Sequence, residues 1–253
     1  MIERINIIVS VLLAGLGLAL GPLNCRILNK IPAKWLCDYD EEPSQELLSG
    51  KRYKLKPHGI AMSLTLAVIL AITSLTANIT ATFPIIIIIL LVLMLIAASD
   101  AKYTIIPDEF TIAAAVLSLI FAVTDLFTAQ NFITTWYTPI LGGLCGGAVL
   151  IALDLFSTLI FKKAGFGFGD VKLMAALGIM FGYKYVFILL VFSCMMAACH
   201  FVAIIFAGKA KKGIYLPMGP YICLGTCLVI IMQPYFETLF NMYRSLMEMQ
   251  VLP

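Results

Sequence analysis

Three aspartates at the edges of apolar segments are the residues of this chain best suited to do chemistry. Asp100 directly follows an apolar run that ends at Ser99, Asp108 follows Pro107, and Asp170 closes the glycine-rich run Gly165-Phe166-Gly167-Phe168-Gly169. A carboxylate beside membrane-grade sequence is energetically expensive, so it is a functional candidate by default. Closely spaced glycines let the backbone approach other groups. These features predict a carboxylate site next to an irregular backbone.

Asp100 and Asp170 are expected at the same depth and on the same face, so they form the candidate catalytic pair. Two carboxylates held close in a partly dehydrated site cannot both ionise easily, and they share a proton. One of them can then draw a proton from water while the other donates one toward a scissile carbonyl. Asp170 opens a helix, whose dipole favours the ionised form, so we expect Asp100 to hold the proton.

Each of the other polar residues near this pair also has a possible structural role. Asp108 follows Pro107 and can cap the helix that it opens. Lys172 lies two positions after Asp170, so it does not face that residue on a helix, and snorkelling to the interface is its default role. Asp154 lies within an apolar segment. Its sequence position is compatible with a hydrogen bond inside the bundle and with a place on a proton path.

No other set of side chains offers competing chemistry. The two histidines, His58 and His200, stand apart and are expected to pack or cap. The seven cysteines include no CxxC pair, and most lie in apolar segments, where a small buried hydrophobe is the expected role. We therefore predict no metal site.

The composition requires a membrane to position these residues. The chain has 253 residues, of which 62% are hydrophobic and 12% charged, whereas soluble domains carry about 25% charged residues. Its basic residues sit in separate loops rather than in a patch, which argues against nucleic acid as a partner. We predict an all-α polytopic protein with about eight spans, at residues 5–27, 58–77, 83–99, 110–128, 137–161, 171–183, 185–207 and 217–233.

Basic residues mark alternate loops, which predicts the orientation of these spans. Lysines and arginines collect in loops 28–57, 99–109, 162–172 and 208–215, whereas the alternate loops hold Lys184 alone. The basic loops are therefore expected in the cytoplasm, with both termini outside it. Apolar residues recur at helical spacing between positions 236 and 247, and this period is explained either by a helix lying in the outer interface or by ordinary packing.

Small residues recur at the spacing used for close helix contacts. Gly17 and Gly21 form one GxxxG pattern, and residues 142–147 hold two overlapping ones. We expect both sets to serve helix packing.

The quoted residues resemble the type IV prepilin peptidase family. Gly167-Phe168-Gly169-Asp170 fits the GxGD motif of membrane aspartic proteases, and its continuation through Lys172, together with Asp100 and Ile106-Pro107-Asp108, fits the prepilin peptidases. The entry to the last span, with Pro217, Gly219 and Pro220, resembles theirs as well. The N-terminal segment of the family is also similar to Gly21–Ile27 and Lys30-Ile31-Pro32. Presenilin-type proteases share GxGD but lack the Ile-Pro-Asp element placed in this way.

The resemblance implies an inner-membrane endopeptidase that removes the basic leader of type IV prepilins or of the pseudopilins of type II secretion and competence systems. Asp100 and Asp170 match the two catalytic aspartates. Supporting residues are Asp108, Gly167, Gly169 and Lys172, and residues near the site are Pro107, Pro217, Gly219 and Pro220. Residues 1–57 correspond to a reduced N-terminal segment, and residues 58–253 to the peptidase core.

This chain differs from many family members in the cysteines that accompany a second activity of the family. Many members also methylate the new N-terminus and carry two CxxC pairs in the first cytoplasmic loop, which resemble a zinc site. Here that loop holds Cys37 alone, with Cys25 just before it. This argues against zinc and weakens the expectation of methylation, which alone would need S-adenosylmethionine. The surviving Leu-Asn and Lys-Ile-Pro pattern keeps methylation open.

Two functions of other classes remain alternatives. A proton-coupled transporter would use Asp154 with Asp100 and Asp170 as a proton path, but transporters usually carry internal repeats, and none is apparent. A non-catalytic assembly subunit would have a degenerate site, whereas both aspartates are intact here.

Overall fold

The computed structural model describes residues 2–37, 42–49, 52–76, 81–128, 132–162, 165–208 and 216–251, and within them it contains helices and no strands. The elements in chain order are α1 (Ile2–Lys30), the 3₁₀-helix η1 (Ala33–Leu36), α2 (Gln45–Leu48), the π-helical turn η2 (Leu55–Gly59), α3 (Ile60–Thr76), α4 (Phe83–Tyr103), α5 (Asp108–Thr128), α6 (Thr138–Phe161), α7 (Phe168–Phe206) and α8 (Gly219–Val251).

Seven helices in the described part of the chain are long and apolar enough to cross a membrane. One of the seven, α7, is a merged pair, because it has 39 residues and Gly182 interrupts it with φ 68° and ψ 177°. A side chain rarely adopts this conformation, whereas glycine does so at little cost. The prediction of an all-α membrane protein with about eight helices is therefore confirmed.

The break at Gly182 folds α7 into a hairpin. A Cβ built on Gly146 of α6 would lie 2.6 Å from the carbonyl oxygen of Met174 and 3.0 Å from Cγ2 of Val186. In one straight helix these two residues would be about 18 Å apart along the axis. Both can meet Gly146 only if the chain reverses between them. We call residues 168–181 the first arm of α7 and residues 183–206 the second arm.

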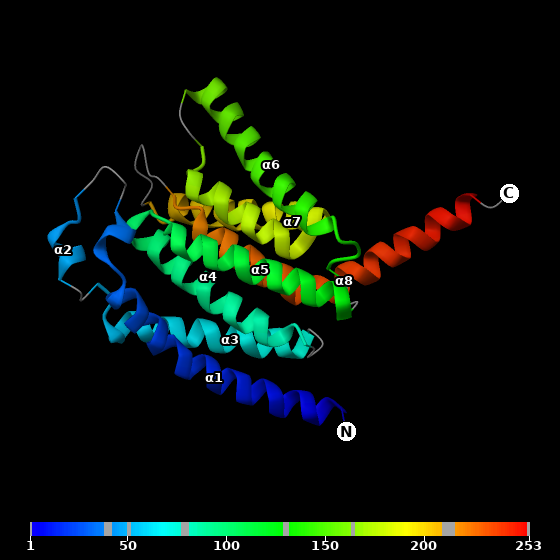
Figure 1. The fold of residues 1–253 in the computed structure, drawn as a ribbon, viewed down its shortest axis with the longest axis horizontal. Helices are drawn as coiled ribbons and strands as arrows, with labels where there is room; N and C mark the ends of the chain where they lie inside the picture. Colours follow the sequence, from blue (N-terminus) through cyan, green and yellow to red (C-terminus); the bar gives the residue numbers. More distant parts are fainter. Residues whose placement is uncertain are drawn as a thin grey trace.

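The last helix differs from the sequence prediction. The sequence prediction ended the last span at residue 233 and explained the helical period after it by an interfacial helix or by ordinary packing, whereas α8 continues through Pro234 as one helix of 33 residues. The rings of Phe236 and Phe240 pack at 6.4 and 6.1 Å from the ring of Tyr185, and the Tyr185 hydroxyl donates to Glu237 at 2.5 Å. These contacts hold the continuing helix against the second arm of α7. Figure 1 shows the end of α8 projecting from the bundle.

The predicted packing role of the glycines is confirmed. Gly17 of α1 lies against the backbone of Ala67 in α3, and a Cβ there would meet it at 2.6 Å. Gly142 of α6 lies in the same way against Gly178 of the first arm of α7. Helices can approach this closely only where both surfaces carry small residues.

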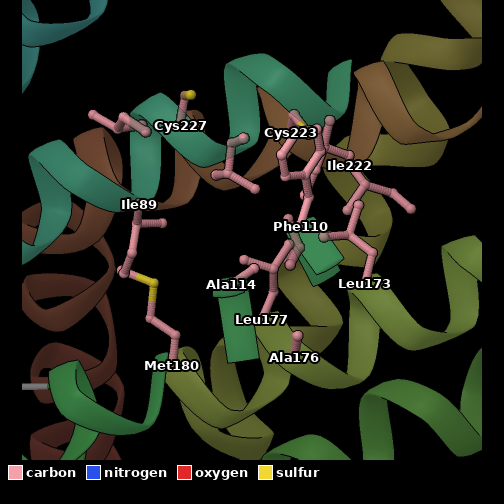
Figure 2. Close-up of a cluster of buried hydrophobic side chains, with 14 of the residues drawn as sticks. Ile89, Phe110, Ala114, Leu173, Ala176, Leu177, Met180, Ile222, Cys223 and Cys227 are labelled. Carbon is pink, nitrogen blue, oxygen red and sulfur yellow. The ribbon is translucent and has the colours of Figure 1, made fainter. Parts of the chain in front are cut away.

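The core that supports the candidate site lies between α4, α5, α7 and α8. Figure 2 shows Ile89, Phe110, Leu177 and Ile222, one from each of these helices, pointing into a common apolar cluster. All four side chains are buried, as are most of their neighbours. This apolar cluster therefore fixes the four helices relative to one another.

The helix ends separate into two sets. α1 and α4 end, and α5, the first arm of α7 and α8 begin, at the end of the bundle that carries α2, whereas the chain termini lie at the opposite end (Figure 1). Several of the basic residues used to predict orientation lie outside the described residues: Lys51, Lys163, Lys209, Lys211 and Lys212. The side of the membrane on which each end lies stays a prediction, as does the division of the chain at residue 57.

Candidate active site

The two aspartates of the predicted pair face one cavity. Asp100 lies in the last turn of α4 and Asp170 in the first turn of α7, and each is only 4% exposed. A cavity of about 590 Å³ includes both among its lining residues. Residues far apart in the sequence are thus brought to one place, at the depth that the spans predicted.

A backbone group from a third helix holds Asp100. The main-chain N–H of Gly219, at the start of α8, donates to Oδ2 of Asp100 at 2.8 Å. A Cβ on Gly219 would stand 2.6 Å from that same oxygen, so only glycine lets α8 come this near. The left-handed Thr104, with φ 56°, ends α4 one turn later, and its N–H donates to the Asp100 carbonyl at 2.8 Å.

Asp170 is bonded on one side only. Its Oδ2 accepts the main-chain N–H of Gly167 at 3.1 Å, so the carboxylate reaches back to the residue that caps α7. Its Oδ1 is buried and has no hydrogen-bond partner among the described residues. A buried carboxylate oxygen without a partner carries a large desolvation cost. Such an oxygen is suited to receive a hydrogen bond from water or from a bound peptide.

Asp108 and Lys172 form an ion pair at the side of the cavity. The Lys172 ammonium donates to both carboxylate oxygens of Asp108, at 2.7 and 2.9 Å, and it lies 4.9 Å from the centre of the Phe168 ring. As predicted, Lys172 does not face Asp170. The sequence prediction assigned Lys172 only to the membrane interface and did not include its ion pair with Asp108. The pair joins the start of α5 to the start of α7, and each side chain is 34% exposed.

Three helix N-termini converge on the pair. α5, α7 and α8 begin at Asp108, Phe168 and Gly219, and their free N–H groups and dipoles favour negative charge nearby. The dipole at the C-terminal end of α4, which carries Asp100, has the opposite sign and disfavours negative charge there. The arrangement partly offsets the cost of burying a carboxylate among these helices.

The glycine-rich run is shaped by two other contacts. A Cβ on Gly169 would stand 3.1 Å from Cβ of Ile106, so the run lies tightly against the segment before α5. At its start, the N–H groups of Gly165 and Phe166 donate to Oδ1 of Asp154 at 2.7 and 3.0 Å. Of the two roles left open for Asp154, the structure therefore shows a hydrogen bond within the protein. Asp154 fixes where the run begins.

The segment after α1 forms another wall of the cavity. Lys34, Trp35 and Cys37 line it, and the Trp35 ring packs edge-on against Phe110 of α5 at 6.3 Å. Lys34 and Trp35 were not among the residues predicted from the sequence. Trp35 is one of only two tryptophans and stands in an otherwise polar loop, which is the signal that could have indicated a half-buried anchor.

A buried arginine fixes this segment. The Arg52 guanidinium donates to the carbonyls of Leu47, Leu28 and Ile31 at 2.9, 3.3 and 2.7 Å. Beside it, the Tyr53 hydroxyl donates to the carbonyl of Ala98 in α4 at 2.7 Å, and burial raises the pKa of that hydroxyl.

Asn29 completes the attachment, because its side chain exchanges two 2.8 Å bonds with the backbone of Tyr53. One turn earlier, Asn24, from the Leu-Asn pattern, donates to the carbonyl of Leu91 in α4 at 3.2 Å. Lys102 of α4 donates to Glu46 at 2.7 Å, and this bond lowers the pKa of Glu46. The segment after α1 is thereby tied to the helix that carries Asp100.

The other predicted residues lie at or near the cavity, or apart from it with partners of their own. Pro107, Asp108, Gly167, Gly169 and Lys172 line the cavity, whereas Pro217 and Pro220 flank Gly219 outside its wall. Both histidines have local partners, as expected: His58 Nδ1 accepts the N–H of Lys54 at 3.3 Å, and His200 is hydrogen-bonded to Tyr221. Within the described ranges, no three His, Cys, Asp or Glu side chains are grouped to hold a metal ion.

The fold and the cavity define a class: a multi-pass membrane protein with two buried aspartates facing one cavity at the ends of its helices. Comparison with known proteins narrows this class. Residues 87–202, which include Asp100, Asp108 and Asp170, match the model of the type IV leader peptidase family. This part of the chain is therefore similar to the type IV leader peptidases, and the resemblance seen in the sequence is confirmed.

Individual relatives agree with the family match. The chain is 26% identical over 150 residues to a prepilin leader peptidase/N-methyltransferase of Bacillus subtilis (strain 168), and the match covers 58% of this chain and 54% of that protein. A protein of the same name from Aeromonas hydrophila is 26% identical over 132 residues, covering 52% and 43% of the two chains. One from Xanthomonas campestris pv. campestris is 29% identical over 130 residues, covering 51% and 43%.

The chain spans about half the length of the curated relatives it matches. No solved structure matches it.

Proposed function

We propose that this protein is an aspartic endopeptidase that cleaves the leader peptide from type IV prepilins or pseudopilins. The observation that carries the proposal is the position of Asp100 and Asp170, two nearly buried carboxylates that face one cavity. The homology to prepilin leader peptidases supplies the class of substrate. The short leader would lie on the cytoplasmic side.

The pair can activate water without a metal ion. One carboxylate takes a proton from water, and the resulting hydroxyl forms a bond to the scissile carbonyl carbon. The other carboxyl group, in its protonated form, donates to the carbonyl oxygen. As the C–N bond breaks, the leaving amine takes the proton that the first carboxylate accepted from water, and the second carboxylate regains its own proton as the carbonyl re-forms. Asp170, at the start of a helix and with Oδ1 unpartnered among the described residues, suits the base. Asp100 then acts as the acid.

The surrounding residues suit an extended peptide. Gly167 and Gly169 line the cavity without side chains, so a substrate backbone can lie beside the carboxylates. The ion pair of Asp108 and Lys172 holds the starts of α5 and α7 together. Gly219 holds Asp100 through its N–H. Each of these acts by positioning, and the bond-breaking steps belong to the pair alone.

We assign the protein to the bacterial inner membrane, with the cavity facing the cytoplasm and both termini on the other side. The support is the concentration of lysines and arginines in the loops at the cavity's end of the bundle. Lipid and prepilin substrates are then its partners, and nucleic acid is not.

Proteolysis is the only activity that we propose. The relatives' names include N-methyltransferase, but no contact described for the segment after α1 favours that chemistry over the structural role given above. Methylation, with its need for S-adenosylmethionine, stays an expectation, and so does the absence of zinc. The transporter alternative loses support, because Asp154 is bound to the backbone of a loop.

Co-expression with a prepilin tests the proposal. Asp100→Asn and Asp170→Asn should each leave the prepilin uncleaved, since an amide can neither take up nor supply the proton. Asp125→Asn is the matched control, because Asp125 is also a buried aspartate but accepts the N–H groups of Phe132 and Ile133 at the other end of the bundle. Near-normal cleavage by either pair variant, measured as the mass of the pilin, would refute the assignment.

A further inference from the structure

The connection between α4 and α5 borders the candidate active site along its whole length. It consists of residues 104–107, and all of them line the cavity that Asp100 and Asp170 face. α4 and α5 pack side by side, and the connection joins them at the end of the bundle that carries α2 (Figure 1). Neighbouring side chains of an extended chain point to opposite faces, so consecutive lining residues bring main-chain groups to the cavity as well.

Two residues of this connection have main-chain groups that the fold does not use. Main-chain hydrogen bonding stops at Thr104, whose N–H donates to the Asp100 carbonyl, and it resumes at Pro107, whose carbonyl accepts two N–H groups of α5. Between them, the N–H and C=O groups of Ile105 and Ile106 have no hydrogen-bond partner among the described residues. Folded proteins pair nearly all of their main-chain groups. Unpaired groups beside two aspartates are therefore suited to a ligand with complementary donors and acceptors.

The connection is held in an extended shape by its neighbours. A proline disfavours helical dihedral angles in the residue before it, and no helix is formed at Ile106, which precedes Pro107. The Ile106 side chain is buried, and its Cβ stands 3.1 Å from the place where a Cβ on Gly169 would lie. This contact with the start of α7 fixes the main chain before a ligand arrives. Binding to it therefore costs little ordering entropy on the protein's side.

We propose that Ile105 and Ile106 bind the main chain of the substrate as a short strand beside Asp100 and Asp170. This inference rests on the proposed function and adds to it the way in which the peptide is held. Successive residues of an extended chain turn their N–H and C=O groups to opposite sides, so one of the two isoleucines offers both groups to the cavity. That residue exchanges two hydrogen bonds with the substrate main chain, as paired strands do.

Main-chain pairing at this place sets the position and the direction of the peptide without reading its side chains. The surrounding helices use most of their main-chain groups internally, whereas the connection keeps its own groups available. Ile105 and Ile106 are substrate-binding residues in this account, and the bond-breaking steps stay with Asp100 and Asp170.

Ester substitution in the protein tests the proposal. Ile105 and Ile106 are replaced, one at a time, by the α-hydroxy acid analogue of isoleucine, which keeps the side chain but puts an ester oxygen in place of the N–H. One of the two esters should raise the KM for a prepilin peptide about fivefold, the factor that one hydrogen bond supplies. The value of kcat should stay near that of the wild-type protein, because the aspartates are untouched.

The control is the same ester at Ile85, the third residue of α4, whose N–H also has no partner among the described residues but lies at the opposite end of the bundle. It should keep the wild-type KM. A wild-type KM in both the Ile105 and the Ile106 esters would overturn the proposal while leaving the proposed function standing. A fall in kcat with an unchanged KM would overturn it too, since the connection would then position Asp100 and not the substrate.

Esters in the substrate show whether the two main chains are bonded to each other. In a synthetic prepilin peptide, one amide at a time beside the cleavage site becomes an ester, which removes an N–H and weakens the carbonyl before it. Losses from groups that interact are non-additive. At one substrate position the ester should therefore raise the KM of the wild-type protein but not that of the sensitive isoleucine variant. Losses that multiply at every position would overturn the proposal, whereas failure of the wild-type protein to cleave the unmodified peptide would overturn the proposed function itself.

Discussion

At the scale of single residues, the geometry of Asp100 depends on a glycine in another helix. The Gly219 N–H donates to Oδ2 of Asp100, and the space where a Cβ would stand is already filled by the Asp100 carboxylate. Adding one methyl group at Gly219 must therefore move either the carboxylate or the start of α8. The positions of catalytic groups matter on the scale of an ångström.

Gly219→Ala should thus lower the rate of leader cleavage by about 100-fold, the cost of misplacing a catalytic group by roughly 1 Å. Cleavage of a prepilin by the purified variant measures this. Gly15→Ala is the matched control, because a Cβ there meets nothing within 4 Å. A Gly219→Ala variant as active as Gly15→Ala would show that the contact does not position Asp100.

Residue types alone indicated the candidate pair but not what holds it. Burying a carboxylate in a membrane costs free energy, so carboxylates at the ends of apolar runs are good functional candidates. This argument identified Asp100 and Asp170. The contacts of Gly219 and Asp154 depend on how α8 and α6 are placed in space, and no sequence pattern encodes a distance between distant segments. Lys172 was misjudged for the same reason, since its partner Asp108 lies on another helix.

At the scale of elements, the run before Asp170 is shaped by the helix that precedes it. Asp154 of α6 accepts the N–H groups of Gly165 and Phe166, and so fixes the point at which the chain leaves α6 for α7. A carboxylate that accepts two backbone donors orders a glycine-rich segment that has little conformational preference of its own.

Asp154→Ala should slow leader cleavage by about tenfold, since each lost bond to a charged group is worth at least the free energy of such a change. Asp154→Asn keeps an acceptor oxygen and should recover most of the rate, while neither variant changes membrane insertion. Rates for both variants and the amount of inserted protein check this. Equal loss in both variants would contradict a role limited to accepting these two hydrogen bonds.

The helices themselves were largely predictable, with one informative exception. Long apolar runs define spans by themselves, and Gly182 beside Lys184 separated two spans that form a helical hairpin. The last span was expected to end at residue 233, whereas contacts of Tyr185 with Phe236 and Phe240 hold the continuation of α8 against the second arm of α7. Packing between distant helices outweighed the local signal there.

At the scale of the whole molecule, the site is assembled from one end of the bundle. The C-terminal end of α4 and the starts of α5, α7 and α8 meet there, and the segment after α1 closes a wall through Trp35. Alternating spans and basic loops predicted which helix ends share a side. They could not predict how the described residues of the loop 28–57 are arranged. That arrangement depends on Arg52, which donates to the carbonyls of Leu28 and Ile31, more than 20 positions earlier in the chain.

The proposed orientation puts this end in the cytoplasm. In a chain freed of its own cysteines, Glu42→Cys marks the end that carries α2, and Trp136→Cys marks the opposite loop, where Trp136 is 73% exposed. A membrane-impermeant thiol reagent added to intact cells should label position 136 and reach position 42 only after the membrane is opened. The reverse pattern would place the site outside and refute the orientation.

The proposed mechanism requires Asp100 and Asp170 to act as one unit on one peptide bond. The decisive measurement is the rate at which purified protein in vesicles releases the leader of a single prepilin, for Asp100→Asn, Asp170→Asn and the double variant. Groups that act together are strongly non-additive, so all three rates should fall to the same background level. Single variants that retain partial activity, with losses that multiply in the double variant, would contradict the shared role of the two aspartates.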